Sequence, residues 1–363
     1  MTRSFVVKWL FINILIHIGF SLWPTHFLWI YQNCIFPVFR IGYDSTFGLL
    51  PFPVVYLLVG VLLVIMGFKI KDLWAFRTAF KYRFYYVQIM EKSLLVGLFS
   101  LSLFYWVWGF HYFQKSNFPA TINQNKLISE VYLKSEFLAV AKKLNTIKYF
   151  MTGDIVPYKD ASKYNNLEKS IRIIQEKTLH DLGYTALGHV RVRYLLPQGT
   201  LLRWSTAGVY FPFIFEGHVD SGLHPIQIPF TLAHEMAHGY GITNEGDCNL
   251  IALIVCLKHK DIQVRYAGLF TYMRYLWSDP RMPVEWKKQL KDTLSKEVLS
   301  DWADIKEQSN KFPDLFPFWR EVVYEAYLHW MGVDEGLDSY FSIVDKYAVL
   351  KTSNPEFSMD KFE

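Results

Sequence analysis

Three long stretches without a charged residue constrain this fold more than any other feature of the sequence. Residues 9–30, 49–68 and 93–113 contain no Asp, Glu, Lys or Arg. Each stretch is close to the ~20 residues that an α-helix needs to cross a bilayer. No small-residue cleavage site follows the first stretch, as a cleavable signal peptide would require. The sequence therefore predicts three membrane-spanning helices.

The basic residues between these stretches predict the orientation of the helices. Five Lys and Arg residues but one acidic residue lie within residues 69–83, whereas residues 31–48 carry only Arg40 and Asp44. Short cytoplasmic loops carry the excess of Lys and Arg in multi-pass proteins. We therefore expect the basic segment and the N-terminus in the cytoplasm. Everything after about Phe113 should then lie outside, which is the periplasm in a bacterium with two membranes.

Composition limits the remaining classes of function. The chain has 363 residues, is 52% hydrophobic and carries a formal net charge of +5. Because much of the positive charge lies in the expected cytoplasmic segment, it does not indicate a nucleic-acid-binding surface. Cys34, Cys248 and Cys256 form no visible disulfide framework. The sequence thus predicts a membrane anchor at residues 1–114 and a folded domain at residues 115–363.

An HExxH motif dominates the second part of the chain. On a helix, residues four apart lie on one face, so His234 and His238 can direct both imidazoles at one ion while Glu235 lies beside them. Pro229 is suited to the start of this helix. A core helix with two hydrogen-bonded histidines is the alternative, but it leaves Glu235 as an unexplained charge among apolar neighbours. We therefore predict a Zn2+ site with Glu235 as the catalytic base.

A catalytic zinc ion normally takes three protein ligands, so a third donor is needed. Gly241 can end the helix with a positive φ and turn the chain back toward the metal. Residues 250–257 are apolar and helix-compatible, which puts Glu245 in the first turn of a second helix. Asp247 is the alternative ligand. We prefer Glu245, because Asn249 then lies four residues later and can support the site from behind the ligands.

Hydrophobic patterning predicts a mainly α domain with a small sheet around this motif. Alternating, β-branched or aromatic residues at 190–196 and 208–215 predict strands. Apolar residues at helical spacing predict helices elsewhere. The predicted helices cover residues 127–151, 161–182, 263–277, 284–309 and 318–331.

Further residues are candidates for contacts with a substrate. In HExxH peptidases an extended strand lies beside the metal helix and pairs with the substrate backbone, and Gly208, Val209 and Tyr210 are placed to do this. A small sheet that merely covers the helix is the alternative. Arg265 or Tyr266 could stabilise the oxyanion that forms when a carbonyl is attacked.

With these motifs the chain resembles a family of bacterial membrane proteins that carry domain of unknown function 3810 and occur mainly in the Bacteroidota. The resemblance covers nearly the whole length. It departs at Gly246 and Asp247, where the family usually has two acidic residues, and at Cys248, where it usually has alanine. The family is similar to zinc-dependent peptidases, so the resemblance implies a reaction class without a substrate. Besides the three apolar stretches, the matching residues are Trp108, Gly109, Tyr112, 208–213, Glu216, 229–231, 234–238, Gly241, 245–249, Arg265, Tyr266, Ser339 and Tyr340.

The sequence thus favours a membrane-anchored zinc metallopeptidase with a zincin-like α+β domain, which acts on a peptide or protein substrate in the cell envelope. The lipid bilayer is the second expected partner, and the oligomeric state stays open. The alternative is a catalytically silent zinc-binding protein of envelope assembly or sensing, which needs the histidines but not Glu235. An intramembrane protease is disfavoured, because the HExxH motif lies more than a hundred residues beyond the last apolar stretch.

Overall fold

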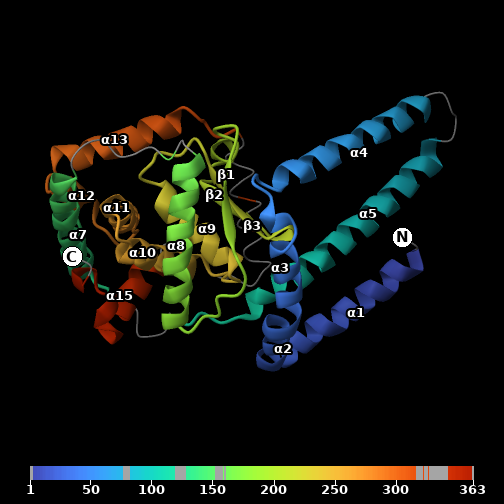
Figure 1. Ribbon diagram of the computed structural model, residues 1–363, viewed down its shortest axis with the longest axis horizontal. Coiled ribbons are helices and arrows are strands. Elements are labelled where there is room, and N and C mark those ends of the chain that lie inside the picture. Colours follow the sequence, from blue (N-terminus) through green and yellow to red (C-terminus); the bar gives the residue numbers. More distant parts are fainter. Residues whose placement is uncertain are drawn as a thin grey trace. The chain divides into compact units, whose positions relative to one another are not determined.

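The chain is mainly helical and contains a small sheet, as the sequence predicts at this coarse level (Figure 1). It divides into two compact units: the first comprises Met1–Gln114 and Phe211–Glu216, and the second comprises Lys115–Tyr210 and Gly217–Glu363. The computed structural model describes residues 3–76, 82–118, 128–151, 158, 161–315, 322, 326 and 342–361.

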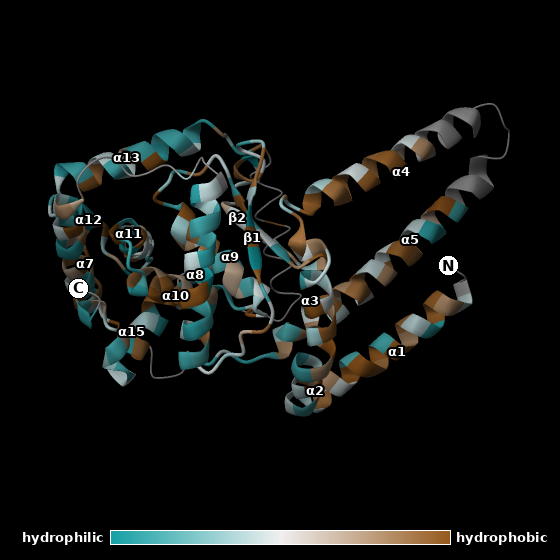
Figure 2. Ribbon diagram, in the orientation of Figure 1, coloured by the Kyte–Doolittle hydropathy of each residue, from teal (hydrophilic) through white to brown (hydrophobic). Residues whose placement is uncertain are grey.

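The first unit consists of helices that are rich in hydrophobic residues (Figure 2). Two polar contacts join its long helices α1 (Arg3–Leu22) and α5 (Tyr82–Val107). Trp9 Nε1 donates to Ser102 Oγ (2.6 Å), and Trp106 Nε1 donates to Asn13 Oδ1 (2.6 Å). The other helices are α2 (Pro24–Ile30), the π-helix η1 (Tyr31–Ile35), α3 (Phe36–Asp44), α4 (Val55–Phe76), and the 3-10 helices η2 (Phe47–Leu49) and η3 (Gly109–Phe113).

Two segments among the described residues are long and apolar enough to cross a membrane, Ser4–Leu22 and Gln88–Val107, and Val55–Phe68 is apolar but shorter. These helices indicate association with a membrane, and the three predicted spans are not confirmed. The bounds predicted for the first span, residues 9–30, are wrong. Its helix breaks before Pro24, because proline has no N–H with which to continue a helix and instead begins α2.

The sheet has three strands in the order β1–β3–β2. They are β1 (Arg191–Leu195), β2 (Gly208–Phe211) and β3 (Glu216–Asp220), so β2 lies at one edge. Strands β2 and β3 are joined by only four residues. Such a short connection requires antiparallel pairing, because a parallel pair needs a long crossover.

The single strand predicted at residues 208–215 is therefore wrong in its second half. Pro212 begins the 3-10 turn η5 (Pro212–Ile214), and Phe215 has a φ of 46°. Proline cannot donate to a strand ladder, and a positive φ reverses the chain. The segment is a hairpin, and its second strand was missed by the sequence prediction.

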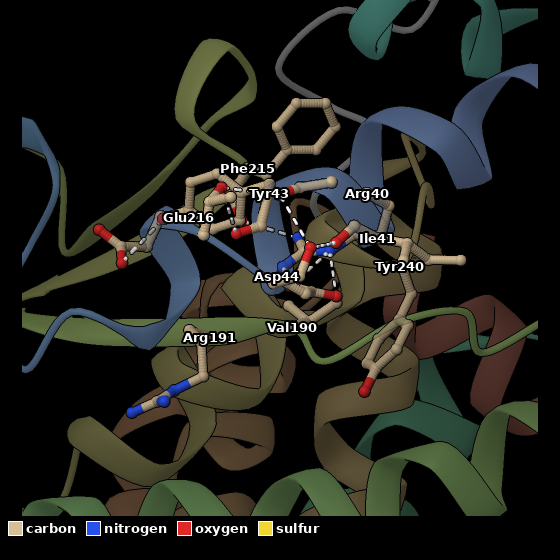
Figure 3. A network of polar contacts seen from close by, with 12 residues as sticks. Arg40, Ile41, Tyr43, Asp44, Val190, Arg191, Phe215, Glu216 and Tyr240 are labelled. Atoms are coloured by element: carbon tan, nitrogen blue, oxygen red, sulfur yellow. Dashed lines mark hydrogen bonds and ion pairs between the residues drawn. The ribbon is translucent and has the colours of Figure 1, made fainter.

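Phe211–Glu216, which comprise the turn between β2 and β3 and one strand residue on either side, belong to the first unit. Figure 3 shows Phe215 and Glu216 of this segment beside Arg40 and Tyr43 of α3. Arg40 of α3 is completely buried, and its Nη1 donates to Phe215 O (2.8 Å). The buried Glu216 carboxylate accepts from Tyr43 Oη (3.2 Å) and from Val54 N (2.9 Å). Arg40 and Tyr43 lie in a segment that was expected only to connect two membrane helices. Their hydrogen bonds instead hold the turn between β2 and β3 in place.

Helix α10 (Glu245–Lys258) forms the core of the second unit. All its residues from Glu245 to Leu257 are buried, which is typical of a helix that is surrounded by other elements. It packs against α8 (Ala161–Asp181), α9 (Ile228–Gly239), α11 (Ile262–Ser278) and α15 (Ile343–Ser353). The remaining elements are α7 (Glu130–Phe150), α12 (Val284–Lys291), α13 (Lys296–Asn310), η4 (Leu202–Trp204), η7 (Pro355–Phe357) and η8 (Met359–Lys361).

The structure confirms the helices predicted at residues 127–151, 161–182 and 263–277, with small changes in their bounds. The helix predicted at 284–309 is wrong in its continuity, because it is divided into α12 and α13. Ser295 begins α13 by accepting a hydrogen bond from the backbone N–H three residues later (3.3 Å), which favours a helix start at this point. Apart from Val322 and Ala326, the helix predicted at residues 318–331 lies outside the described residues, as do Ser339 and Tyr340.

Candidate metal centre

Two consecutive helices bring the predicted ligands together. Helix α9 carries His234 and His238 one turn apart. After this helix Gly241 adopts a φ of 88°, the left-handed conformation that glycine tolerates best. Asn244 then caps α10, with its side chain accepting from the backbone N–H three residues later (3.0 Å). This cap places Glu245 in the first turn, facing the two histidines.

The three side chains present their ligand atoms at the corners of a small triangle. The Nε2 atoms of His234 and His238 are 3.2 Å apart. Glu245 Oε2 lies 3.1 Å from the first of these atoms and 3.4 Å from the second. A tetrahedral ion with bonds of about 2.0–2.1 Å holds its ligand atoms roughly 3.3–3.4 Å apart. The spacing fits a zinc-sized ion, and this is the only group of this kind within the described part of the chain.

Hydrogen bonds fix which ring nitrogen of each histidine faces the triangle. His238 Nδ1 lies 2.8 Å from the carbonyl oxygen of Ile242, which can only accept, so Nδ1 carries the proton. His234 Nδ1 is held in the same way, 2.8 Å from Asn249 Oδ1. In the neutral form that binds a metal ion, both imidazoles would therefore turn an Nε2 lone pair toward each other and toward a carboxylate. Three electron-rich atoms at this spacing favour a cation between them.

The electrostatics of the three ligand side chains also favour a cation between them. Burial alone would raise the pKa of the Glu245 carboxyl, but His238 and His234 outweigh this effect and hold that pKa below its usual range. Burial alone would lower the pKa of His238, but Cys248 and Glu245 outweigh it and hold that pKa well above its usual range. The cluster therefore attracts positive charge, as a metal site must.

Glu235 stands beside the ligands and is not one of the three. The residue is buried, and burial raises the pKa of its carboxyl, an effect that His234 and His238 oppose. A raised pKa suits a carboxylate that must accept and then return a proton near neutral pH.

Asp247, the alternative ligand, is engaged elsewhere. It forms an ion pair with Lys346 of α15, and both residues are buried. Its carboxylate also accepts from Ser116 Oγ (2.8 Å) and from Tyr184 Oη (2.9 Å). Burial and the nearby Asp247 charge raise the pKa of Tyr184, so its hydroxyl keeps the proton that it donates. Among the described residues Asp247 thus joins three distant segments and lies outside the ligand triangle.

The two oxyanion candidates also have other partners. Tyr266 Oη donates to Asp301 Oδ2 (2.5 Å), and Arg265 Nη1 donates to the carbonyl oxygen of His259 (3.3 Å). The structure does not bring either residue to the ligand triangle. A different α11 residue, Tyr275, shares a hydrogen bond with Asn249. Tyr275 lies nine residues beyond Tyr266, which is about 13 Å by helix rise.

The predicted substrate strand corresponds to edge strand β2. Gly208 and Tyr210 are buried, whereas Val209 lies on the other face and is 37% exposed. Gly208 lies against the side chain of Glu235. The contacts of Tyr275 with Asn249 and of the Ile242 carbonyl with His238 were not predicted from the sequence, and no local pattern indicates them.

The comparisons with known proteins confirm the family that the sequence resembles. Residues 31–346 match the family described as "Protein of unknown function (DUF3810)". Neither the curated proteins nor the solved structures contain a match to the chain. Because the matched residues cover most of the sequence, the chain belongs to the DUF3810 family.

Proposed function

We propose that this protein is a membrane-anchored zinc metallopeptidase that hydrolyses a peptide or protein substrate in the cell envelope. The observation that carries the proposal is the triangle of His234, His238 and Glu245, with Glu235 beside it. Three described ligands leave a fourth position for water or substrate, which is the pattern of catalytic rather than structural zinc sites.

Each residue has a chemical role in this proposal. The two histidines and Glu245 hold the ion, and Asn249 and the Ile242 carbonyl keep both imidazoles in the tautomer that binds it. A zinc ion bound there would supply the Lewis acidity for attack of water on the scissile carbonyl. Glu235 would take a proton from the attacking water and return it to the leaving amine.

Edge strand β2 supports a peptide substrate. An edge strand has backbone N–H and C=O groups on one side that an extended peptide can use. Strand β2 lies at the edge of the sheet, and its residue Gly208 adjoins Glu235. A peptide that extends the sheet at β2 would therefore pass close to the proposed base.

The location and fold class belong to the same proposal. We propose that α1, α4 and α5 span the membrane and that the second unit is a zincin-like domain on the periplasmic side. The apolar helices and the basic residues within 69–83 support this orientation.

One observation favours the alternative of a silent zinc-binding protein. The side chains of His234, His238 and Glu245 are only 11%, 10% and 6% exposed, so access to the ion is narrow.

The test compares cells that carry the full-length protein, its Glu235→Gln variant or a deletion. N-terminal peptides of envelope proteins are quantified, and zinc is measured in each purified protein. Glu235→Gln preserves the shape and removes the base, so we expect about one zinc per chain and the loss of the N-termini that depend on the wild type. General base catalysis contributes roughly 10²–10⁴-fold to the rate.

Two variants complete the experiment. The His234→Ala variant should bind no zinc and should not produce the N-termini that depend on the wild type. His259 lies outside the triangle and is hydrogen-bonded to Ser170, so the His259→Ala variant should keep both the zinc and the N-termini. If Glu235→Gln restores every N-terminus that the wild type produces, the hydrolytic mechanism is wrong and zinc binding alone remains.

A further inference from the structure

Helix α9 and the sheet approach each other unusually closely at three glycines. A Cβ atom built on Gly239 of α9 would lie 2.2 Å from Val190 Cγ1 and 3.4 Å from Tyr210 Cε2. Real Cβ atoms essentially never approach other heavy atoms within 3.0 Å. The other two glycines, Gly208 on β2 and Gly217 on β3, lie on the two neighbouring strands.

The Glu235 side chain occupies the space that the two strand glycines leave. A Cβ atom at Gly217 would lie 3.2 Å from Glu235 Cβ and 3.0 Å from Val192 Cγ2. A Cβ atom at Gly208 would lie 2.7 Å from both Cγ and Oε1 of Glu235, and 2.9 Å from the His218 carbonyl oxygen. The side chain therefore crosses β3 at its base and ends against the backbone of edge strand β2.

Backbone conformation does not explain these glycines. The glycines with positive φ in the described chain are at 183, 188, 199 and 241, and neither strand glycine is among them. A glycine inside a strand normally weakens the strand and often marks a close approach of other atoms. The missing side chain is thus what these two positions contribute.

We propose that Gly208 and Gly217 are positioning residues that form a slot for the Glu235 carboxylate and hold it beside edge strand β2. The proposal rests on the proposed function for its role in catalysis. A side chain at position 208 would meet the flexible end of Glu235, so the carboxylate would be displaced first. The atoms nearest to either glycine belong to other residues than His234 and His238, so the ligands should stay in place.

The test is a double-mutant cycle on the full-length protein in detergent, with thermal unfolding and zinc content as readouts. Gly208→Ala overpacks the site and should lower Tm by roughly 2–12 °C. In the Glu235→Ala background the same change should cost less than half as much, because two of the three nearest atoms belong to Glu235 and the third is the His218 carbonyl oxygen. Zinc should stay near one per chain in all four proteins.

Gly268→Ala is the matched control. Its Cβ atom would lie 2.5 Å from Cys256 Cβ, a comparable clash in the core that does not involve Glu235. It should lower Tm equally with and without Glu235→Ala. If Gly208→Ala prevents folding, Gly217→Ala is the milder variant, since its contacts are 3.0 Å or longer. It meets Glu235 at Cβ, which alanine keeps, so this second cycle uses Glu235→Gly, and Gly217→Ala should lower Tm less in that background.

An equal Tm loss from Gly208→Ala in both backgrounds would overturn the slot, and so would the loss of zinc from Gly208→Ala. The cycle requires no hydrolysis. The slot can therefore be refuted while the Glu235→Gln experiment supports the peptidase, and the reverse outcome is equally distinguishable.

Discussion

Replacing Asp247 by alanine should damage stability and leave zinc in place. The Lys346 and Asp247 side chains are only 6% and 2% exposed, so their ion pair is buried and the weak energies of surface pairs do not apply. Removing one partner of a buried pair typically costs about 3–5 kcal/mol, because the other charge stays buried. At about 2–4 °C per kcal/mol for a domain of 150–250 residues, we expect Tm to fall by roughly 6–20 °C.

Thermal unfolding and zinc content of the full-length protein measure these two effects separately. Asp247→Asn should cost less than Asp247→Ala, since the amide oxygen still accepts from Ser116 and Tyr184. Glu245→Ala should show the opposite behaviour and lose zinc, because two histidines alone are too few ligands. If Asp247→Ala removes the ion while Glu245→Ala retains it, the ligand assignment is wrong. An unchanged Tm would refute the argument from the buried pair.

Three further outcomes are expected. Asn249→Ala should weaken zinc binding about 10–100-fold in competition with a chelator, and Asn249→Asp should lose less because its oxygen still accepts from His234; equal affinity in all three proteins would refute the support role. At pH 8 the exposed Cys34 should react with a thiol reagent, whereas the buried Cys248 and Cys256 should react only after unfolding. Burial raises the pKa of both buried thiols, that of Cys248 to about 11. Three reactive thiols in the folded protein would contradict this prediction. In spheroplasts a membrane-impermeant maleimide should label Cys34 but not a Cys34→Ser variant, and labelling that requires lysis would reverse the proposed orientation.

The sequence predicted the cluster of His234, His238 and Glu245 because its information is local. A spacing of four residues on a helix places His234 and His238 together whatever the rest of the chain does. The turn at Gly241 and the position of Asn249 follow from equally short-range rules. Short-range rules do not decide whether Glu245 or Asp247 is the third ligand. The two residues are two positions apart and therefore point to opposite sides of the helix, and the side that faces the histidines depends on the packing of the helix. Asp247 is held by segments that no local pattern connects with it.

The failures have the same physical origin. Strand β3 was missed because its residues, Glu216 to Asp220, are mostly polar or small and yet all buried, so they show no apolar alternation. Tyr266 was a reasonable oxyanion candidate by residue type, but the register of α11 sends Tyr275 toward Asn249 instead. Tertiary contacts decide such cases, and periodicity does not record them.

The hydrogen bonds between α3 and the turn that joins β2 and β3 determine which fragments of the protein are suitable for experiments. A fragment that starts at Lys115 retains Glu216 but discards Arg40, Tyr43 and Val54. The Glu216 carboxylate would lose the hydrogen bonds from Tyr43 and Val54. Phe213 would lose its ring contact with Phe104, and Phe215 would lose those with Phe36 and Tyr43. Since β2 leads directly from this turn to Gly208, truncation would loosen the strand beside Glu235. A soluble fragment could therefore bind zinc and still lack activity, and such a result would say nothing about the intact protein.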